Sequence, residues 1–460
     1  MADQRAARLE RLVRQTQARE RIPALSVAVH RADRPLWTFQ VGTSGRPAAP
    51  LGPQTRFRMG SITKTFTAVL VMQCRDEGLL DLDDPVAAHL SVPAHGELTI
   101  RRLLSHTSGL QREPHGDVWD SLRMPDTEQV LADLARAERV LPTARRFHYS
   151  NLGLAVLGQV VGRLRGATWA EVLAERILRP LGLDGISVAA DTACAVGYLV
   201  DSWSDHVRPE PDTEMGGVAP AAQLWSTAAD LARWAAFLAD PATVDPAGAV
   251  LAPSTVEEMR WPLAVTDEAQ WVAGFGLGLI VVPRPDRVTH VGHDGAMPGF
   301  IASAYGRLGG PDAPPALGVA ALSSSGTAVA TGELVHTLLA VDADEFPAEI
   351  APWTPGEPAP DDLRPLLGHW WSEGFEWIFT WRDGALRARR VLDAVHKPPS
   401  VFERLDGVAD ELRTQSGGEA GERLRVLRDP VTGAVASMRW ATYRFTRSQE
   451  TFSAERPSEP

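Results

Sequence analysis

The chain has 460 residues, of which 44% are hydrophobic and 23% charged, a composition typical of a globular protein with two or three domains. Its formal net charge of −12 and the absence of a basic stripe argue against a nucleic-acid-binding protein. The two cysteines, Cys74 and Cys194, are too few for a disulfide framework and lack metal-site spacing, so we expect buried thiols. No cofactor or metal motif is visible elsewhere in the sequence.

The N-terminal segment predicts a surface helix rather than a signal peptide. Residues 1–22 contain arginine and glutamate throughout and lack the apolar stretch that a signal peptide requires. The spacing of Ala7, Leu9, Leu12 and Val13 is instead that of an amphipathic helix. No later segment is long and apolar enough to span a membrane. We therefore expect a cytoplasmic protein without a membrane partner.

Predicted strands lie at both ends of residues 1–341, with helices between them. Two strands are predicted within residues 24–42, around a turn at 31–34, and the most apolar helix is predicted over 62–80. Further helices are predicted at 97–105, 127–138, 152–165, 169–178, 227–239 and 328–340, and further strands at 277–282, 299–306 and 316–323. This order predicts an α+β fold in which helices pack on an antiparallel sheet.

The C-terminal part of the chain has a different character. Residues 342–362 are acidic and rich in proline, which predicts an extended linker. Short strand-like segments then follow at 366–372, 375–381, 385–391, 401–405, 411–415, 423–428 and 435–446. Their regular spacing predicts a small antiparallel barrel at 363–450, followed by a flexible tail at 451–460. Residues 363–460 carry 15 Lys+Arg and 14 Asp+Glu, against 31 and 44 in the rest of the chain.

The first chemical signal is a serine followed three residues later by a lysine. The chain has only two lysines, and one of them, Lys64, follows Ser61 at the start of the predicted apolar helix. Residues three apart lie on one helix face, and a serine hydroxyl needs a base within reach to act as a nucleophile. Burial can neutralise a lysine amine but not an arginine guanidinium. We predict that Ser61 is a nucleophile and Lys64 its base; a capping serine beside a surface lysine is the alternative.

A second signal is the polar sequence Tyr149-Ser150-Asn151, which precedes the predicted helix 152–165. Tyrosine occurs only four times in the chain, so its place beside asparagine is informative. A nearby ammonium group shifts a phenol pKa, which makes Tyr149 a candidate acid or base. Asn151 offers an amide that can hold a substrate. Taken alone, Ser150 or Asn151 can equally be a helix cap.

The third signal is His293-Asp294-Gly295, ahead of a predicted strand. Gly295 and Gly299 allow a backbone to approach a ligand closely. His293 can orient a carboxylate or assist proton transfer. His290, three residues earlier, is an alternative candidate.

In this order, the three stretches resemble the signature of the serine β-lactamase and penicillin-binding-protein superfamily: S-x-x-K, Y-x-N, then K-T-G or H-x-G. The class C β-lactamase-like branch, which includes D-aminopeptidases and esterases, is most similar. Residues 103–110 and 217–231 also resemble that branch, and the resemblance covers roughly residues 5–340. It implies a β-lactamase-like catalytic domain over residues 1–341.

The resemblance assigns a role to each matching residue. Ser61 is then the acylated nucleophile, Lys64 and Tyr149 share the base and acid roles, and Asn151 binds the substrate amide. His293 takes the place of the third-motif lysine.

The resemblance also implies an oxyanion hole. It is formed by the backbone N–H groups of Ser61 and Ala296, with Gly295 allowing the substrate to approach. His-Asp-Gly replaces Lys-Thr-Gly here, so the permanent cation that clamps a carboxylate is missing. That departure disfavours true β-lactamase activity and favours peptide, amide or ester substrates, as does the lack of an export signal.

Residues 366–374, LLGHWWSEG, resemble the lipocalin-like C-terminal domain found in some members of this branch. The pairing is most similar to penicillin-binding-protein-type thioesterases, the stand-alone cyclases that release nonribosomal peptides. The resemblance implies that a peptidyl thioester with a D-configured C-terminal residue acylates Ser61 and is released by macrolactamisation or hydrolysis. A carrier protein of the assembly line is the implied partner.

An arginine near the end of the barrel is implied to contact substrate. A strand over Met438–Arg447 would place Arg444 on one face with Trp440 and Thr442. A plain surface arginine is the alternative. For the whole protein, the alternatives are a D-aminopeptidase or esterase that only hydrolyses, and a penicillin-binding-type ligand-binding protein without activity.

Overall fold

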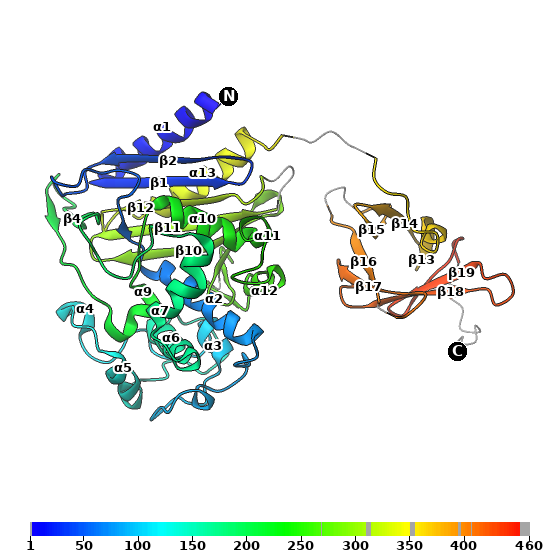
Figure 1. The fold of residues 1–460 in the computed structure, drawn as a ribbon, viewed down its shortest axis with the longest axis horizontal. Helices are drawn as coiled ribbons and strands as arrows, with labels where there is room; N and C mark the ends of the chain where they lie inside the picture. The colour runs from blue at the N-terminus through cyan, green and yellow to red at the C-terminus, as the bar shows by residue number, and fades with distance from the viewer. Residues whose placement is uncertain are drawn as a thin grey trace. The chain divides into compact units, whose positions relative to one another are not determined.

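The computed structural model describes residues 2–267, 269–309, 314–349, 355–393, 397–405 and 407–450 (Figure 1). The chain divides into two compact units, residues 1–349 and 350–460.

The first unit is built on an antiparallel sheet of eight strands in the order β2-β1-β12-β11-β10-β9-β8-β7. The strands are β1 (Ala24–Arg31), β2 (Arg34–Gly42), β7 (Ala264–Val265), β8 (Gly274–Phe275), β9 (Ile280–Arg284), β10 (Val288–Met297), β11 (Phe300–Leu308) and β12 (Gly318–Ser323). β1 pairs with β12, so the two ends of this unit meet in one sheet. The predicted α+β fold is confirmed.

Helices cover both faces of this sheet. Helices α1 (Ala2–Glu20) and α13 (Thr331–Glu345) lie on one side, and α10 (Ala228–Ala239) packs on the other (Figure 1). Glycine is required where α10 crosses: a Cβ at Gly306 or Gly318 would lie 2.3 Å from a backbone oxygen of α10. Because both faces are covered, β1 is buried along almost its whole length.

The other helices of this unit include α2 and α6, on which candidate site residues lie. They are α2 (Thr63–Asp76), α3 (Ile100–Leu104), α4 (Val118–Ser121), α5 (Thr127–Asp133), α6 (Asn151–Arg165), α7 (Trp169–Leu173), α8 (Arg179–Leu181), α9 (Ala219–Ala222), α11 (Pro241–Val244) and α12 (Pro253–Met259). α2 is buried from Thr63 to Cys74, and the rings of Phe66 and Trp234 stack at 3.9 Å. α2 ends before Gly78, whose φ of 71° suits glycine and turns the chain, so the helix is shorter than the predicted 62–80.

Strand β10 was not predicted. Its sequence, VTHVGHDGAM, has two glycines and two histidines and no regular alternation. The neighbouring strands β9 and β11 supply the pairing that this sequence does not signal. The predicted third motif therefore lies within a strand instead of in a segment ahead of one.

The second unit is an antiparallel barrel of eight consecutive strands. They are β13 (Gly368–Ser372), β14 (Phe375–Arg382), β15 (Ala385–Arg390), β16 (Ser400–Arg404), β17 (Glu411–Ser416), β18 (Arg423–Arg428), β19 (Val435–Trp440) and β20 (Tyr443–Phe445). Reciprocal backbone hydrogen bonds of 2.8 and 3.0 Å between Trp371 and Thr446 nearly close the barrel. Large apolar side chains, including Trp370, Phe379 and Trp440, fill its interior.

The predicted face of Arg444 is wrong. The segment 435–446 was predicted as one strand, but it turns sharply at Ala441, where φ is 53°. As a result Arg444 lies opposite Arg439 on the outer surface, whereas Trp440 is buried in the barrel interior. In a continuous strand, residues 440 and 444 would point to the same face; the turn between them places their side chains on opposite faces.

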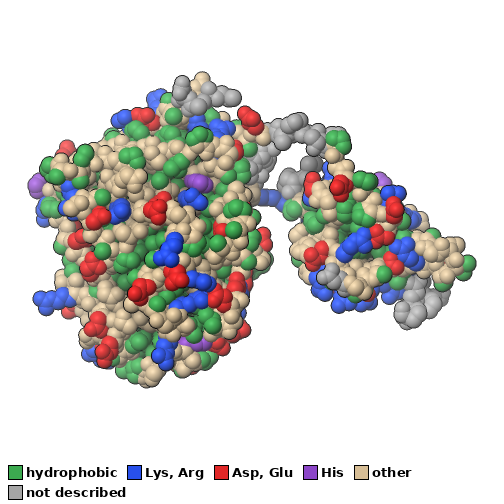
Figure 2. All heavy atoms as spheres, viewed as in Figure 1, with side chains coloured by type: hydrophobic (Ala, Val, Ile, Leu, Met, Phe, Trp, Pro, Cys, Tyr) green, Lys and Arg blue, Asp and Glu red, His purple; other side chains and the backbone are tan. Residues whose placement is uncertain are grey.

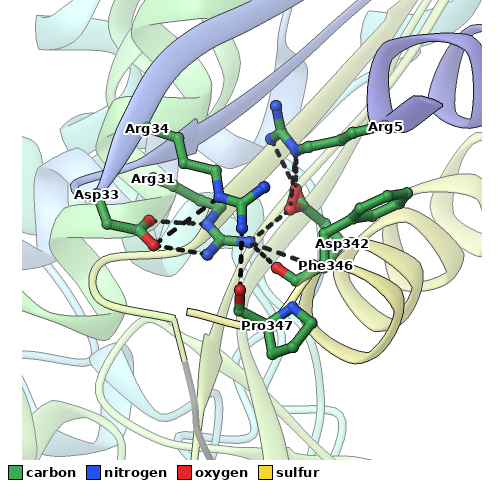
Figure 3. Close-up of polar contacts among 7 residues, drawn as sticks. All are labelled: Arg5, Arg31, Asp33, Arg34, Asp342, Phe346 and Pro347. Carbon is green, nitrogen blue, oxygen red and sulfur yellow. Dashed lines mark hydrogen bonds and ion pairs between the residues drawn. The ribbon is translucent and has the colours of Figure 1, made fainter. Parts of the chain in front are cut away.

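Helix α13 extends four residues into the segment predicted as a linker. Asp342, predicted to begin that linker, is fully buried and forms ion pairs with Arg5 at 2.7 Å and Arg31 at 2.9 Å (Figure 3). Arg31 also donates to the carbonyl of Phe346, and Arg34 to that of Pro347. These contacts fix the end of the first unit. Residues 350–354 of the predicted linker and the predicted tail 451–460 lie outside the described residues.

Across the described ranges, no helix combines the length and apolar character needed to cross a lipid bilayer. The cytoplasmic location predicted from the sequence stays a prediction.

Candidate active site

Ser61 and Lys64 meet at the start of α2. Ser61 lies in the turn η1 (Gly60–Ile62), and Lys64 lies in the first turn of the helix. Lys64 is fully buried, and its Nζ is 3.0 Å from Ser61 Oγ and donates to the carbonyl of Ala221 in α9 at 2.8 Å. Burial lowers the pKa of Lys64 well below 10.5; Glu113 opposes this shift and Arg112 adds to it. The amine can therefore accept the serine proton.

Tyr149 completes a cluster with these two residues. The Nζ of Lys64 lies 4.8 Å from the centre of the Tyr149 ring, and the Arg112 guanidinium lies 4.9 Å from it. Burial raises the pKa of Tyr149 above 10, opposed by a hydrogen bond with Ser61 and by Arg112. The phenol therefore keeps its proton and can donate it. Ser150 caps α6, accepting from the Gly153 N–H, as the capping alternative predicted for Ser150.

His293 lies on β10, facing the same cluster, with its ring centre 6.1 Å from that of Tyr149. Its Nδ1 lies 2.5 Å from the carbonyl oxygen of Asp294, so Nδ1 carries the proton. Burial, and then the charge of Lys64, lower the pKa of His293 to about 4. The imidazole is neutral at pH 7. Its Nε2 has no hydrogen-bond partner among the described residues and is free to accept from a ligand.

The alternative histidine, His290, is not part of this cluster. Residues 290 and 293 point to opposite faces of β10. His290 contacts α13 instead, with its Nδ1 2.9 Å from Nδ1 of His336.

Asp294 also points away from the cluster, yet it supports His293. The Ser303 hydroxyl donates to Asp294 Oδ1 at 2.7 Å, and the Tyr305 hydroxyl donates to Oδ2 at 2.8 Å. Both donors lie on β11. They hold in place the residue whose carbonyl accepts the His293 proton.

Two glycines let η1 and β10 come together. A Cβ at Gly295 would lie 2.0 Å from the Met59 oxygen and 3.1 Å from Ser61 N. Gly60, with a φ of 52°, would place a Cβ 2.8 Å from Ala296 N. β9 pairs with β10 only as far as Gly292, so beyond this point the backbone of η1 borders β10. This close approach brings the backbone at Ser61 beside that at Ala296, the two residues whose amides the resemblance assigns to the oxyanion hole.

Asn151, the first residue of α6, is oriented by an unpredicted carboxylate. Its Nδ2 donates to Glu113 Oε1 at 2.6 Å, and its backbone N–H donates to the Arg112 carbonyl at 2.7 Å. Its buried Oδ1 has no partner in the described part of the chain. Asn151 can thus accept an N–H from a substrate amide as well as donate.

Sequence reasoning missed His106, Arg112 and Glu113. His106 is fully buried with a positive φ of 54°, and its Nδ1 accepts from the Ser150 N–H at 3.1 Å. Its ring lies 4.3 Å from that of Tyr149 and 4.7 Å from that of Phe275 on β8. These residues lie in irregular chain, where no periodicity marks them; the only signal was the resemblance of residues 103–110.

The site therefore unites seven of the eight predicted residues. Ser61, Lys64, Tyr149, Asn151, His293, Gly295 and Ala296 lie together in the first unit. Arg444 belongs to the second unit.

Fold and site define a serine hydrolase class, and the sequence comparison agrees: residues 9–341 match the Beta-lactamase family model. The chain belongs to the beta-lactamase family. Residues 359–447 match a domain of unknown function, DUF7586. Penicillin-binding protein 4 of Amycolatopsis lactamdurans is 33% identical over 340 residues, covering 69% of this chain and 85% of that protein. Unguisins hydrolase ungD' of Aspergillus campestris is 30% identical over 318 residues, which cover 63% of this chain and 57% of that protein.

The chain is also similar to solved structures. SurE is similar with a TM-score of 0.61 and 26% identity, over 97% of this chain and 100% of that chain. SurE with D-Leu gives a TM-score of 0.59 at the same identity and coverage. A D-stereospecific amidohydrolase from Streptomyces sp. shares the fold, with a TM-score of 0.60 at 22% identity over 74% of this chain and 99% of that one. The predicted family resemblance is confirmed.

Proposed function

We propose that the protein is a stand-alone thioesterase and cyclase of nonribosomal peptide biosynthesis. In this proposal a peptidyl thioester with a D-configured C-terminal residue acylates Ser61, and the peptide leaves as a macrolactam or as a free acid. The observation that carries the acyl-enzyme step is the fully buried Lys64 amine, 3.0 Å from Ser61 Oγ.

In the first half-reaction, Ser61 Oγ attacks the thioester carbonyl carbon while Lys64 Nζ takes the hydroxyl proton. The carbonyl oxygen becomes an oxyanion that the amides of Ser61 and Ala296 stabilise. The carbon–sulfur bond then breaks, and the thiolate takes a proton from the Tyr149 phenol. The Lys64 ammonium returns its proton to Tyr149, so both groups regain their starting state.

In the second half-reaction, the N-terminal or side-chain amine of the same peptide attacks the Ser61 ester. Lys64 accepts a proton from the attacking amine, and the Ser61 oxygen leaves with that proton as the ester bond breaks. The product is a cyclic amide. Water in place of the amine gives the linear acid by the same proton transfers, so the nucleophile alone distinguishes cyclase from hydrolase.

The choice of a peptide over a β-lactam rests on His293. A neutral imidazole with a pKa of about 4 provides no permanent cation for a free carboxylate. Its unpartnered Nε2 accepts instead, which suits a substrate N–H.

The D configuration and the second unit are supported by similarity. SurE is similar across both units of this chain, and it has been crystallised with D-Leu. Arg444 remains the proposed substrate contact of the second unit, exposed on β20.

The proposal is tested with peptide thioesters that end in a D-residue, compared with the L-epimers by mass spectrometry. Formation of the ring from the D-terminal peptide supports the cyclase. Linear acid alone, across varied D-terminal peptides, would replace the cyclase with a hydrolase.

That hydrolase, a D-aminopeptidase or esterase, is the second candidate, favoured by the similarity to Unguisins hydrolase ungD'. The third candidate, a ligand-binding protein without activity, is separated by an acyl-enzyme burst with an activated ester. The burst is expected in the wild type and is lost in Ser61→Ala; its absence from the wild type would leave only ligand binding.

A further inference from the structure

His106 is a buried histidine beside the catalytic residues, and no proton transfer of the proposed reaction uses it. Histidine side chains are visible on the surface of the first unit in Figure 2, whereas His106 is fully buried. Burying a polar ring costs free energy unless its contacts offset the loss of water. The contacts of His106 therefore indicate why the ring is there.

The backbone at His106 favours a different residue. Helix α3 ends with Ser105 as its C-cap, and His106 follows it with a φ of 54°. Glycine is the usual residue at this position, because a left-handed backbone has a steric cost for any residue with a Cβ. The histidine is kept in spite of that cost, so its side chain contributes something that glycine cannot.

Three contacts of His106 converge on Tyr149 and its two neighbours in the chain. The His148 N–H donates to the His106 carbonyl at 2.8 Å, and the Ser150 N–H donates to Nδ1 of the His106 ring at 3.1 Å. The His106 ring lies 4.3 Å from the Tyr149 ring, at an interplanar angle of 32°. His106 thus holds the residue before Tyr149, the residue after it and the phenol ring itself.

The contact with Ser150 requires a neutral imidazole. A ring nitrogen that accepts a hydrogen bond carries no proton, so the proton of His106 is on Nε2. Burial lowers the pKa of His106 well below 6.5, which keeps the ring neutral at pH 7. Nε2 has no hydrogen-bond partner in the described part of the chain, which adds to the cost of burying this side chain.

Resting on the acid role that the proposed function gives to Tyr149, we propose that His106 is the positioning residue for Tyr149 and holds its hydroxyl where it can protonate the leaving thiolate. Within the described ranges the Tyr149 backbone makes no hydrogen bond, so its place depends on the neighbours that His106 holds. A catalytic group displaced by about 1 Å can lose roughly 10² in rate.

The test compares two substrates with the same acyl group and different leaving groups. An alkyl thioester leaves as a basic thiolate that needs the Tyr149 proton, whereas a p-nitrophenyl ester leaves as a stabilised anion that does not. The variant is His106→Asn, because asparagine tolerates a positive φ and its oxygen can accept from the Ser150 N–H, but the ring is lost. We expect acyl-enzyme formation to fall roughly ten- to hundredfold more for the thioester than for the ester.

His290→Asn is the matched control, because His290 is also buried but lies outside the cluster, against His336. It should change the rates with the two substrates by the same factor. Thermal unfolding verifies that both variants fold. Equal losses on the two substrates in His106→Asn would overturn the proposal, since they would indicate a general disturbance of the site.

A double-mutant cycle tests whether His106 acts through Tyr149. Tyr149→Phe should itself reduce acylation by the thioester more than acylation by the ester. In that background His106→Asn should cost less than about threefold more, because the group it positions is already gone. A full additional loss would contradict the proposal.

The same cycle separates this inference from the proposed function. A selective loss in Tyr149→Phe without one in His106→Asn leaves the acid role intact and rejects His106 as its positioning residue. If Tyr149→Phe affects both leaving groups equally, the acid role fails, and the positioning role fails with it.

Discussion

Lys64 and Arg31 are both basic residues with completely buried side chains in the first unit, but their surroundings differ. Lys64 hydrogen-bonds to a serine and a backbone carbonyl, and burial lowers its pKa well below 10.5. Burial also acts to lower the pKa of Arg31, but Asp33 and Asp342 overcome it and raise that pKa. A buried cation that pairs directly with carboxylates stays charged and holds the fold together. A buried amine without such a pair loses its proton and becomes available for chemistry.

The largest effect is expected at Lys64. Lys64→Arg replaces an amine that can lose its proton with a guanidinium that cannot, so acylation of Ser61 should fall roughly 10²- to 10⁴-fold. The measurement is the burst of acyl-enzyme with an activated ester, followed by mass spectrometry.

Lys64→Met is the matched variant for packing, because it is similar in length and uncharged. It should lose as much activity as Lys64→Arg. A Lys64→Arg protein that acylates at the wild-type rate would contradict the role of Lys64 as the base.

The second-largest effect is expected on the free energy of unfolding and concerns the buried ion pair of Arg31. Asp342→Asn leaves Arg5 and Arg31 buried beside an uncharged side chain, because it removes the carboxylate that both contact. Removing one partner of a buried ion pair costs about 3–5 kcal/mol of unfolding free energy. Denaturant unfolding measures the loss, while the activity of the folded fraction should be unchanged.

An exposed ion pair between helices α1 and α13 provides the control. Arg8 of α1 pairs with Glu345 of α13, but both side chains are more than two-fifths exposed, at 42% and 44%. Glu345→Gln should therefore change the unfolding free energy by about 0–1 kcal/mol. Equal losses for Asp342→Asn and Glu345→Gln would show that burial does not distinguish the two pairs.

A third prediction extends the comparison to the buried histidines. Burial lowers the pKa of His290 to about 3, and burial with Lys64 lowers that of His293 to about 4. In the unfolded chain both titrate near 6.5, so the unfolded state binds more protons below that pH. The stability they contribute is complete above about pH 6.5 and is lost as the pH falls toward 4.

Urea unfolding at a series of pH values measures this loss. His290→Gln removes the histidine outside the active site and should flatten the pH dependence. An unchanged slope would mean that His290 is protonated with equal ease in both states.

The smallest effect is expected from Tyr305→Phe. The substitution removes one of the two hydroxyls that hold Asp294, whose carbonyl fixes the proton on Nδ1 of His293. One net hydrogen bond is worth about 0.5–1.5 kcal/mol, which corresponds to a roughly two- to tenfold fall in kcat. Nitrogen NMR of His293 measures the tautomer directly. A changed kcat with an unchanged tautomer would assign Tyr305 another role.

Local sequence patterns were sufficient to predict the nucleophile and its base. Ser61 and Lys64 are three residues apart on a strongly apolar stretch, and helical geometry alone places them on one face. The strands β1 and β2 and most of the barrel strands were predicted because alternation and turn residues mark them locally. Helices α2 and α6 followed from their apolar spacing, whereas α9, whose Ala221 carbonyl accepts from Lys64, was not predicted.

Other features were not visible in local sequence. Strand β10 contains two glycines, and they are there because Gly295 lies against the backbone of η1, a contact between distant segments. The acidic composition of residues 342–362 favoured a linker, yet Asp342 is helical and buried because two distant arginines neutralise it. The turn at Ala441 reversed the expected face of Arg444 within a single residue step.

The sequence by itself determined the family, the α+β class with its added barrel, and the residue types of the Ser61–Lys64–Tyr149 cluster, because short spacings and turn signals encode them. Only the tertiary structure decided the protonation of these groups. A pKa depends on burial and on neighbours brought together by folding, so the lowered pKa of Lys64 and the neutral state of His293 follow from packing.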